Sequence, residues 1–264
     1  MEQIFGPTGE PKYTSQKTLG IHFFDGDVDQ AIDFMFRHGG FMVAPSGTCF
    51  ARLRRDTAYR DAMTRADLAI PDSGAMVLLW KFLRGRNMTR ISGLRYLQRL
   101  VARLLAEKPG SVFWVLPTED AHEKTAHWLS ANRFAFANED LYVAPRYGSI
   151  IEDPVLLAKI ENQKPAQVII GIGSGPQEKL GLYLRDNLSY RPAIHCIGGA
   201  LGFLTGDQVA IPDWADRFYL GWLFRLAAQP GVFIPRLVRA LELPWLIGKY
   251  GEDLPPVKHR WSDV

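Results

Sequence analysis

The sequence predicts an α/β fold, in which a mostly parallel sheet carries helices on both faces and a helical appendage follows at the C-terminus. Short apolar runs alternate with segments of helical periodicity through most of the 264 residues. Glycine-rich turns follow several of these runs, as they do where a parallel strand leads into a helix. After about residue 207 this alternation stops, and aromatic and basic residues gather between prolines. We expect a loose polar arm over 1–17, the α/β core over 18–210 and the appendage over 211–264.

The first part of the core contains five expected elements. Residues 18–24 predict a strand, and residues 28–38 predict a short helix that ends at a Gly-Gly pair. The apolar run 40–44 is typical of a buried strand. Residues 49–65 have helical periodicity, with arginine and aspartate on the solvent side. Residues 66–70 predict the next strand, which stops at the sequence Pro-Asp-Ser-Gly.

The middle of the core continues the same alternation. Residues 75–83 predict a helix, and residues 94–107 predict an amphipathic helix that a Pro-Gly pair closes. The apolar run at 111–116 predicts a strand, residues 121–132 a helix and residues 141–144 a short strand.

The last part of the core contains the most distinctive turn. Residues 154–163 predict a helix with Asp153 as its N-cap. The apolar run 168–172 predicts a strand, residues 177–188 a helix and residues 193–197 a final strand. The whole arrangement is Rossmann-like, and ligands of such sheets bind beyond the carboxyl ends of the strands. The loops of interest are therefore 45–48, 71–74, 173–178 and 198–206.

Composition excludes several classes of protein. A net charge of +3 and a pI of about 8.8 are too mild to indicate a nucleic-acid partner. The two cysteines form no CxxC pair, and the six histidines lack the spacing of metal ligands, so we expect neither a disulfide nor a bound metal. The N-terminus lacks a signal-peptide pattern, and no run of about 18 uncharged apolar residues predicts a membrane span.

The glycine-rich loop after the 168–172 run is the strongest candidate for a ligand site. Gly171, Gly173 and Gly175 bring bare backbone N–H groups to the start of a helix, as in phosphate-binding loops. A tight turn that binds no ligand would have the same glycine-rich sequence. The loop is not a GxGxxG motif, because Pro176 interrupts it and no acidic residue follows the next strand. A dinucleotide oxidoreductase is therefore disfavoured.

Two further loops carry polar residues suited to chemistry. Asp72 ends a strand and could act as a general base, or it could cap the helix that begins near Ser73. Arg90 and Gly93 precede a helix, and Arg90 could bind phosphate or simply lie in solvent. A second glycine-rich turn at 198–206 could line the same crevice or mark a close backbone approach.

The appendage could lie on a membrane surface. Residues 218–250 combine tryptophan, phenylalanine and arginine with a single acidic residue. The alternatives are a subdomain that packs on the core and a contact between subunits of a homo-oligomer.

Together these pieces resemble the WecG/TagA/CpsF glycosyltransferases, which build bacterial surface polysaccharides. The resemblance covers roughly residues 20–240 and rests on five segments that occur in the same order: 65–77, 89–97, 171–178, 196–214 and 221–230.

The resemblance implies a metal-independent, inverting transfer of an N-acetylmannosamine-like sugar from a UDP-sugar to a polyprenyl-diphosphate-linked saccharide acceptor. It implies a cytoplasmic enzyme at the membrane surface, with the UDP-sugar as donor substrate and no cofactor. Asp72 matches the catalytic base. The resemblance implies as substrate-binding residues Arg90, Gly93, Gln177, Glu178, Arg225 and Arg236. From the loops at the strand ends we add Ser46, Gly173, Gly175, Gly198 and Gly199.

Several crevice residues depart from the family pattern, which motivates a second hypothesis. A catalytically impaired protein of this fold could bind a nucleotide or serve as a scaffold in the same pathway. The departures are Ala44, Ser46, Ser73, Gly175, Pro176, Leu201, Gly202, Gly221 and Val232.

Overall fold

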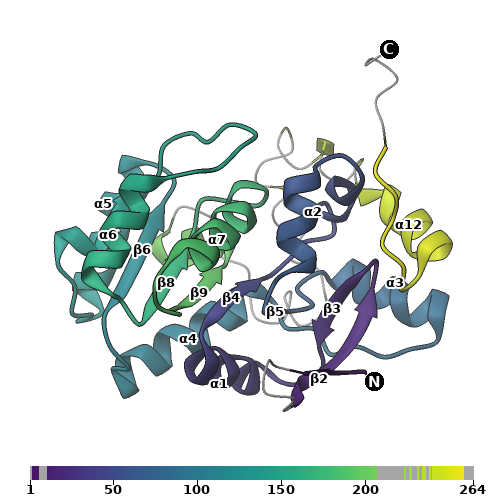
Figure 1. The fold of residues 1–264 in the computed structure, drawn as a ribbon, viewed down its shortest axis with the longest axis horizontal. Helices are drawn as coiled ribbons and strands as arrows, with labels where there is room; N and C mark the ends of the chain where they lie inside the picture. The colour runs from purple at the N-terminus through teal and green to yellow at the C-terminus, as the bar shows by residue number, and fades with distance from the viewer. Residues whose placement is uncertain are drawn as a thin grey trace.

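The structure is a computed structural model that describes residues 2–5, 11–206 and 241–258, together with eight scattered residues between 223 and 240. Its described part forms a nine-stranded sheet in the order β1-β2-β3-β5-β4-β9-β8-β6-β7 (Figure 1). The pairings from β3 to β7 across the sheet are all parallel, whereas β1 and β2 are antiparallel to their neighbours. The predicted α/β fold with a mostly parallel sheet is confirmed.

The strands and helices have the following bounds. The strands are β1 (Glu2–Phe5), β2 (Pro11–Thr18), β3 (Ile21–Phe24), β4 (Gly40–Val43), β5 (Leu68–Ala69), β6 (Val112–Leu116), β7 (Leu141–Val143), β8 (Gln167–Ile170) and β9 (Ala193–Cys196). The α-helices are α1 (Val28–His38), α2 (Thr57–Thr64), α3 (Gly74–Arg84), α4 (Gly93–Glu107), α5 (Glu119–Ala131), α6 (Pro154–Gln163), α7 (Pro176–Asn187), α8 (Leu201–Thr205) and α12 (Glu242–Tyr250). Short 3-10 helices are η1 (Phe50–Arg54), η2 (Asn138–Asp140) and η3 (Gly198–Ala200).

Helices cover both faces of the sheet, because side chains alternate between two apolar cores. Phe41 and Val43 of β4 face one core, to which α2, α3, α6, α7 and α12 contribute. Met42 faces the other core, to which α1, α4, α5 and α8 contribute. In Figure 1, α2 and α7 lie on one side of the central strands, and α1 and α4 lie on the other. No helix within the described ranges is long and apolar enough to span a bilayer.

The expected loose arm at the N-terminus is wrong for the residues described there. β1 and β2 pair with each other, and β2 pairs with β3 as a hairpin that extends the sheet. The strand expected over 18–24 is interrupted by a turn at Leu19 and Gly20, which both have positive φ, at 51° and 79°. The polar residues of β2 therefore belong to an antiparallel hairpin near the edge of the sheet, in which Thr14 is exposed and Ser15 and Thr18 are buried.

The helix expected over 49–65 is two elements. The 3-10 helix η1 ends before Asp56, whose carboxylate accepts a hydrogen bond from the N–H of Tyr59 at 2.9 Å and caps α2. An aspartate placed as an N-cap begins a new helix, and periodicity alone did not reveal the break.

The described end of the appendage packs on the core. Leu243, Leu246 and Ile247 of α12 are buried in the same core as α2 and α3. Glu242 forms ion pairs with Arg54 and Arg55 at 3.5 and 2.8 Å. The described end of the appendage therefore follows the alternative in which it packs on the core.

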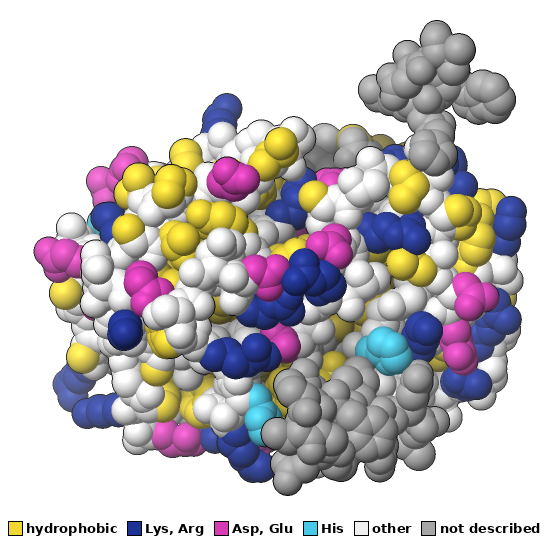
Figure 2. Space-filling model, viewed as in Figure 1, with side chains coloured by type: hydrophobic (Ala, Val, Ile, Leu, Met, Phe, Trp, Pro, Cys, Tyr) yellow, Lys and Arg dark blue, Asp and Glu magenta, His cyan; other side chains and the backbone are white. Residues whose placement is uncertain are grey.

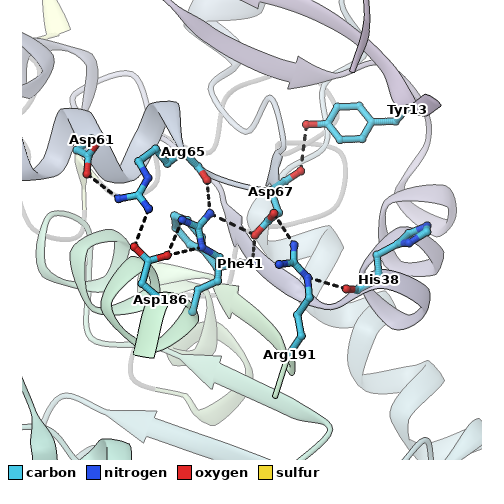
Figure 3. A network of polar contacts seen from close by, with 9 residues as sticks. Tyr13, His38, Phe41, Asp61, Arg65, Asp67, Asp186 and Arg191 are labelled. Atoms are coloured by element: carbon cyan, nitrogen blue, oxygen red, sulfur yellow. Dashed lines mark hydrogen bonds and ion pairs between the residues drawn. The ribbon is translucent and has the colours of Figure 1, made fainter. Parts of the chain in front are cut away.

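An ionic network fastens the sheet at the edge where the parallel strands begin (Figure 3). The buried carboxylate of Asp67, just before β5, accepts a hydrogen bond from the N–H of Phe41 at 2.9 Å. It also pairs with Arg191, before β9, at 2.6 Å and with Arg185 of α7 at 3.5 Å. These contacts fix the relative positions of β4, β5 and β9, so the loops at the opposite ends of the same strands are held in register.

Candidate active site

Four of the expected loops meet at the carboxyl edge of the sheet. β4 lies between β5 and β9, and β8 follows β9 in the same parallel direction. Their C-terminal ends consequently open on one edge, where residues 44–49, 70–73, 171–175 and 197–200 follow the strands. This is the edge at which doubly wound sheets bind their ligands.

Asp72 does not cap α3, which was the alternative to a catalytic role. Ser73 is the cap of that helix, because its hydroxyl accepts a hydrogen bond from the N–H of Met76 at 3.2 Å. The half-buried carboxylate of Asp72 instead accepts a hydrogen bond from the N–H of Gly93 at 2.8 Å. Gly93 is the first residue of α4, so the carboxylate lies at the positive end of that helix dipole.

Arg90 and Gly93 join Asp72 in one cluster. The Nε of Arg90 donates to the backbone carbonyl of Asp72 at 2.9 Å, and the arginine is half-buried. A methyl group added to Gly93 would lie 3.8 Å from Oδ1 of Asp72 and 3.9 Å from Cβ of Ala44. The absence of a side chain at Gly93 therefore leaves space beside the carboxylate, next to the loop that follows β4.

The glycine-rich loop offers unused backbone donors. Gly173 and Gly175 have φ of 92° and 105°, which favours glycine at both positions. Among the described residues, the N–H groups of Ile172, Gly173 and Ser174 have no hydrogen-bond acceptor. A methyl group at Gly173 would meet no described residue within 4 Å. Consecutive N–H groups beside open space, at the start of a helix, form a nest that suits an anion.

Gln177 and Glu178 lie behind this loop and brace it. They are 2% and 0% exposed, respectively. The carboxylate of Glu178 accepts from the N–H of Gly175 at 2.6 Å and from the hydroxyl of Ser174 at 3.1 Å. The side chain of Gln177 accepts from the N–H of Gly198 at 2.7 Å and donates to Glu178 at 3.1 Å. The pair therefore ties the glycine loop to the turn after β9.

Burial affects the chemistry of this brace. It raises the pKa of the Glu178 carboxyl above its ordinary value, against the lowering effect of the hydrogen bonds from Gly175, Gln177 and Ser174. A carboxyl group this deep is suited to shaping the loop rather than to touching a ligand.

A chain of polar contacts connects the loop after β4 to the glycine loop. The hydroxyl of Ser46 lies 3.1 Å from the thiol of Cys49, and that thiol lies 3.0 Å from the hydroxyl of Ser174. Ser46 is half-buried, whereas Cys49 is buried. Of the glycines after β9, Gly198 is buried against Gln177 and Gly199 is exposed at the edge.

Sequence reasoning missed one cation at this edge. Arg52 of η1 is exposed, and its guanidinium lies against the backbone of Gly175, although 123 positions separate the two residues. No local motif marks this arginine, because only the fold brings η1 beside the glycine loop. Arg225 and Arg236, the two expected appendage arginines, lie outside the described residues.

The described side chains include no group of three or more histidine, cysteine, aspartate or glutamate residues that could hold a metal ion. Basic and acidic side chains are mixed over the face of the molecule drawn in Figure 2. The described residues of that face therefore form no broad stripe of one sign, which is the kind of surface that binds a polyanion.

Comparison with known proteins adds the remaining evidence. A model of the family described as the glycosyl transferase WecG/TagA/CpsF family matches residues 16–252. A protein of Bacillus subtilis (strain 168) is 22% identical over 231 residues, which cover 85% of this chain and 86% of the relative. That relative is named N-acetylglucosaminyldiphosphoundecaprenol N-acetyl-beta-D-mannosaminyltransferase.

Proposed function

The chain belongs to the WecG/TagA/CpsF family of glycosyl transferases, and on that premise we propose that it moves an N-acetylmannosamine-like sugar from a UDP-sugar to a polyprenyl-diphosphate-linked saccharide. The name of the Bacillus subtilis relative supports this choice of sugar and acceptor. The observation that carries the proposal is the position of Asp72, beside Gly93 and Arg90 at the same sheet edge as the open N–H groups of the glycine loop.

Asp72 would act as the general base. Its carboxylate takes the proton of the acceptor hydroxyl, and the resulting oxygen attacks the anomeric carbon of the donor sugar. The bond from that carbon to the diphosphate oxygen breaks on the opposite face, and UDP leaves with the electron pair. One displacement of this kind inverts the anomeric configuration. The hydrogen bond from Gly93 fixes one carboxylate oxygen and thereby orients the group.

The glycine loop would receive the charge of the leaving diphosphate. The N–H groups of Ile172, Gly173 and Ser174 point to no acceptor among the described residues, and Arg90 adds a cation close to Asp72. Donors fixed before the reaction stabilise developing negative charge without reorganisation, and each is worth about 3–4 kcal/mol in known enzymes. With these donors, the proposed departure of UDP requires no bound metal ion.

Contact with the membrane surface follows from the lipid-linked acceptor that we propose. Two packed helices, α3 and α12, expose apolar side chains: Phe82 is 79% exposed and Trp245 is 45% exposed. Arg84 and Lys249 are exposed on the same helices. Exposed aromatic residues beside cations are typical of segments that rest on an anionic lipid surface.

One observation favours the alternative of a nucleotide-binding scaffold. Gln177 and Glu178, which the resemblance assigns to the substrate, point away from the loop surface and serve as internal braces. Under this alternative, UDP still binds at the glycine loop and no sugar is transferred.

A transfer assay separates the two. Purified protein, UDP-N-acetylmannosamine and a short-chain polyprenyl-diphosphate-N-acetylglucosamine acceptor would be incubated with EDTA, and the lipid product followed by mass spectrometry. We expect a disaccharide lipid and stoichiometric UDP release. UDP binding without any product, over a panel of UDP-sugars and with added divalent metal, would support the scaffold and contradict the transferase mechanism.

A further inference from the structure

Arg52 has a position that the reaction described above does not use. We propose that its guanidinium binds the diphosphate of the nucleotide donor over the glycine loop. This inference rests on the proposed function, because it assumes that a nucleoside diphosphate occupies that loop.

A contact between the start of η1 and the glycine loop places Arg52 on that loop. The 3-10 helix η1 starts just after the β4 loop, and the thiol of Cys49, its N-cap residue, contacts the hydroxyl of Ser174 at 3.0 Å. This contact brings the start of η1 against the glycine loop. Arg52, three residues further on, then reaches Gly175, and its guanidinium lies 6.0 Å from the centre of the Tyr59 ring.

Gly175 makes room for this guanidinium. A methyl group at Gly175 would overlap Nη1 of Arg52 and lie 3.0 Å from its Cζ. The φ of Gly175, at 105°, is one that other residues rarely adopt. Glycine is therefore needed here twice, once for the backbone conformation and once for the approach of the arginine.

The charge of Arg52 has no carboxylate partner in the described part of the chain. Its neighbours Arg54 and Arg55 both pair with Glu242. The nearby acids are also engaged: Asp56 pairs with Lys179 at 2.9 Å, and Glu178 lies under the loop with its oxygens bonded to Gly175, Ser174 and Gln177. Arg52 is therefore the one arginine of η1 and its C-cap that forms no ion pair in the described ranges, and it faces the loop.

The loop itself supplies donors but no cation. Residues 165–178 contain neither lysine nor arginine. The N–H groups of Ile172, Gly173 and Ser174 offer hydrogen bonds beside open space, and Arg52 brings a planar fork of N–H groups to the adjacent Gly175. Guanidinium groups bind phosphate through two parallel hydrogen bonds, so the two sets of donors suit adjacent phosphates of one diphosphate.

The test compares UDP with uridine in two matched variants. Arg52→Gln removes the charge at the loop, and Arg55→Gln removes a charge from the same segment, where the partner is Glu242. UDP affinity would be measured by isothermal titration calorimetry at fixed ionic strength, and uridine binding by ligand-observed NMR. We expect R52Q to bind UDP about 10- to 100-fold more weakly, the range of a charge-assisted hydrogen bond. Uridine binding by R52Q, and UDP binding by R55Q, should stay within about twofold of wild type.

The outcomes separate the two proposals. Wild-type affinity of R52Q for UDP would overturn the role of Arg52 and leave the proposed transferase function intact. An equal loss of UDP and uridine binding would have the same meaning. A wild-type protein that binds no UDP would overturn the proposed donor, and the role of Arg52 with it. Should R52Q not fold, Arg52→Lys keeps the charge without the planar fork, and a several-fold weaker UDP affinity is then the expected result.

Discussion

Replacement of Asp72 by asparagine tests the proposed mechanism most directly, because the structure predicts different effects on chemistry and on folding. Oδ1 of Asp72 accepts the hydrogen bond from Gly93 at 2.8 Å, and an asparagine carbonyl can accept the same bond. Arg90 bonds to the backbone carbonyl of residue 72, which the substitution does not alter. D72N therefore keeps both of these hydrogen bonds and loses the charge at the start of α4, which is worth about 0.3–1 kcal/mol of stability.

Alanine at this position provides the contrast. D72A removes the acceptor of the buried N–H of Gly93 as well as the charge. An unsatisfied buried donor costs about 1–3 kcal/mol, so D72A should be clearly less stable than D72N in urea unfolding. The difference between the two variants measures the structural role of the carboxylate separately from its chemistry.

Turnover should fall strongly in both variants. An amide cannot accept the acceptor proton, and loss of a general base typically lowers the rate about 10²- to 10⁴-fold. The assay is the initial rate of lipid-disaccharide formation at saturating substrates, with UDP affinity measured by calorimetry in parallel. D72N with more than a tenth of wild-type turnover would refute the role of Asp72 as base. A D72N protein that also loses UDP binding would show that the residue acts on the structure instead.

Three further perturbations test other parts of the structure. Burial lowers the pKa of His195 to about 3. Between pH 6.5, the ordinary pKa of histidine, and pH 3, the imidazole is therefore protonated in the unfolded chain and neutral in the folded chain. The free energy of unfolding should then decrease as pH falls from 6.5 towards 3, by up to about 1.4 kcal/mol per pH unit. The free energy would be measured by urea unfolding at several pH values, and an equal pH dependence in His195→Gln would contradict this prediction. Gly93→Ala adds a methyl at ordinary contact distance from Asp72, 3.8 Å, so the variant should unfold within about 1 kcal/mol of wild type. Its turnover should nevertheless fall about 10-fold or more if substrate uses that space, and undiminished turnover would contradict the site. Leu246→Ala, in a fully buried position of α12, should cost about 2–5 kcal/mol in urea unfolding, whereas a cost below 1 kcal/mol would show that α12 is not part of the core.

Local signals in the chain were sufficient for most of the core. The alternation of apolar runs with amphipathic segments predicted α1, α3 to α7 and the strands from β4 to β9, because each of these elements buries a face that its own periodicity reveals. Asp153 was correctly predicted as the N-cap of α6, since its side chain accepts a hydrogen bond from the N–H of Leu156 at 2.9 Å. A cap is a contact between near neighbours, so the sequence contains both partners.

The N-terminal hairpin and the position of the C-terminal helix could not be predicted from such local signals. The strand β2 is polar because it lies near the edge of the sheet, and its partner β3 decides its conformation. The apolar side of α12 is equally suited to a membrane, to another subunit or to the core. Only the positions of α3 and η1 show that Leu243, Leu246 and Ile247 bury themselves in this molecule.

The α/β class, the strand-end loops and the choice of Asp72, Arg90 and the glycine loop could all be predicted from the sequence, because each depends on residues that are close along the chain. How these residues contact one another follows from the three-dimensional fold. It joins Asp72 to Gly93 across 21 positions, turns Gln177 and Glu178 inward to brace two loops, and sets Arg52 over Gly175 from a distant segment. Such contacts depend on the order of β5, β4, β9 and β8 in the sheet. That order is set by the packing of whole elements on both faces, and no short stretch of sequence contains it.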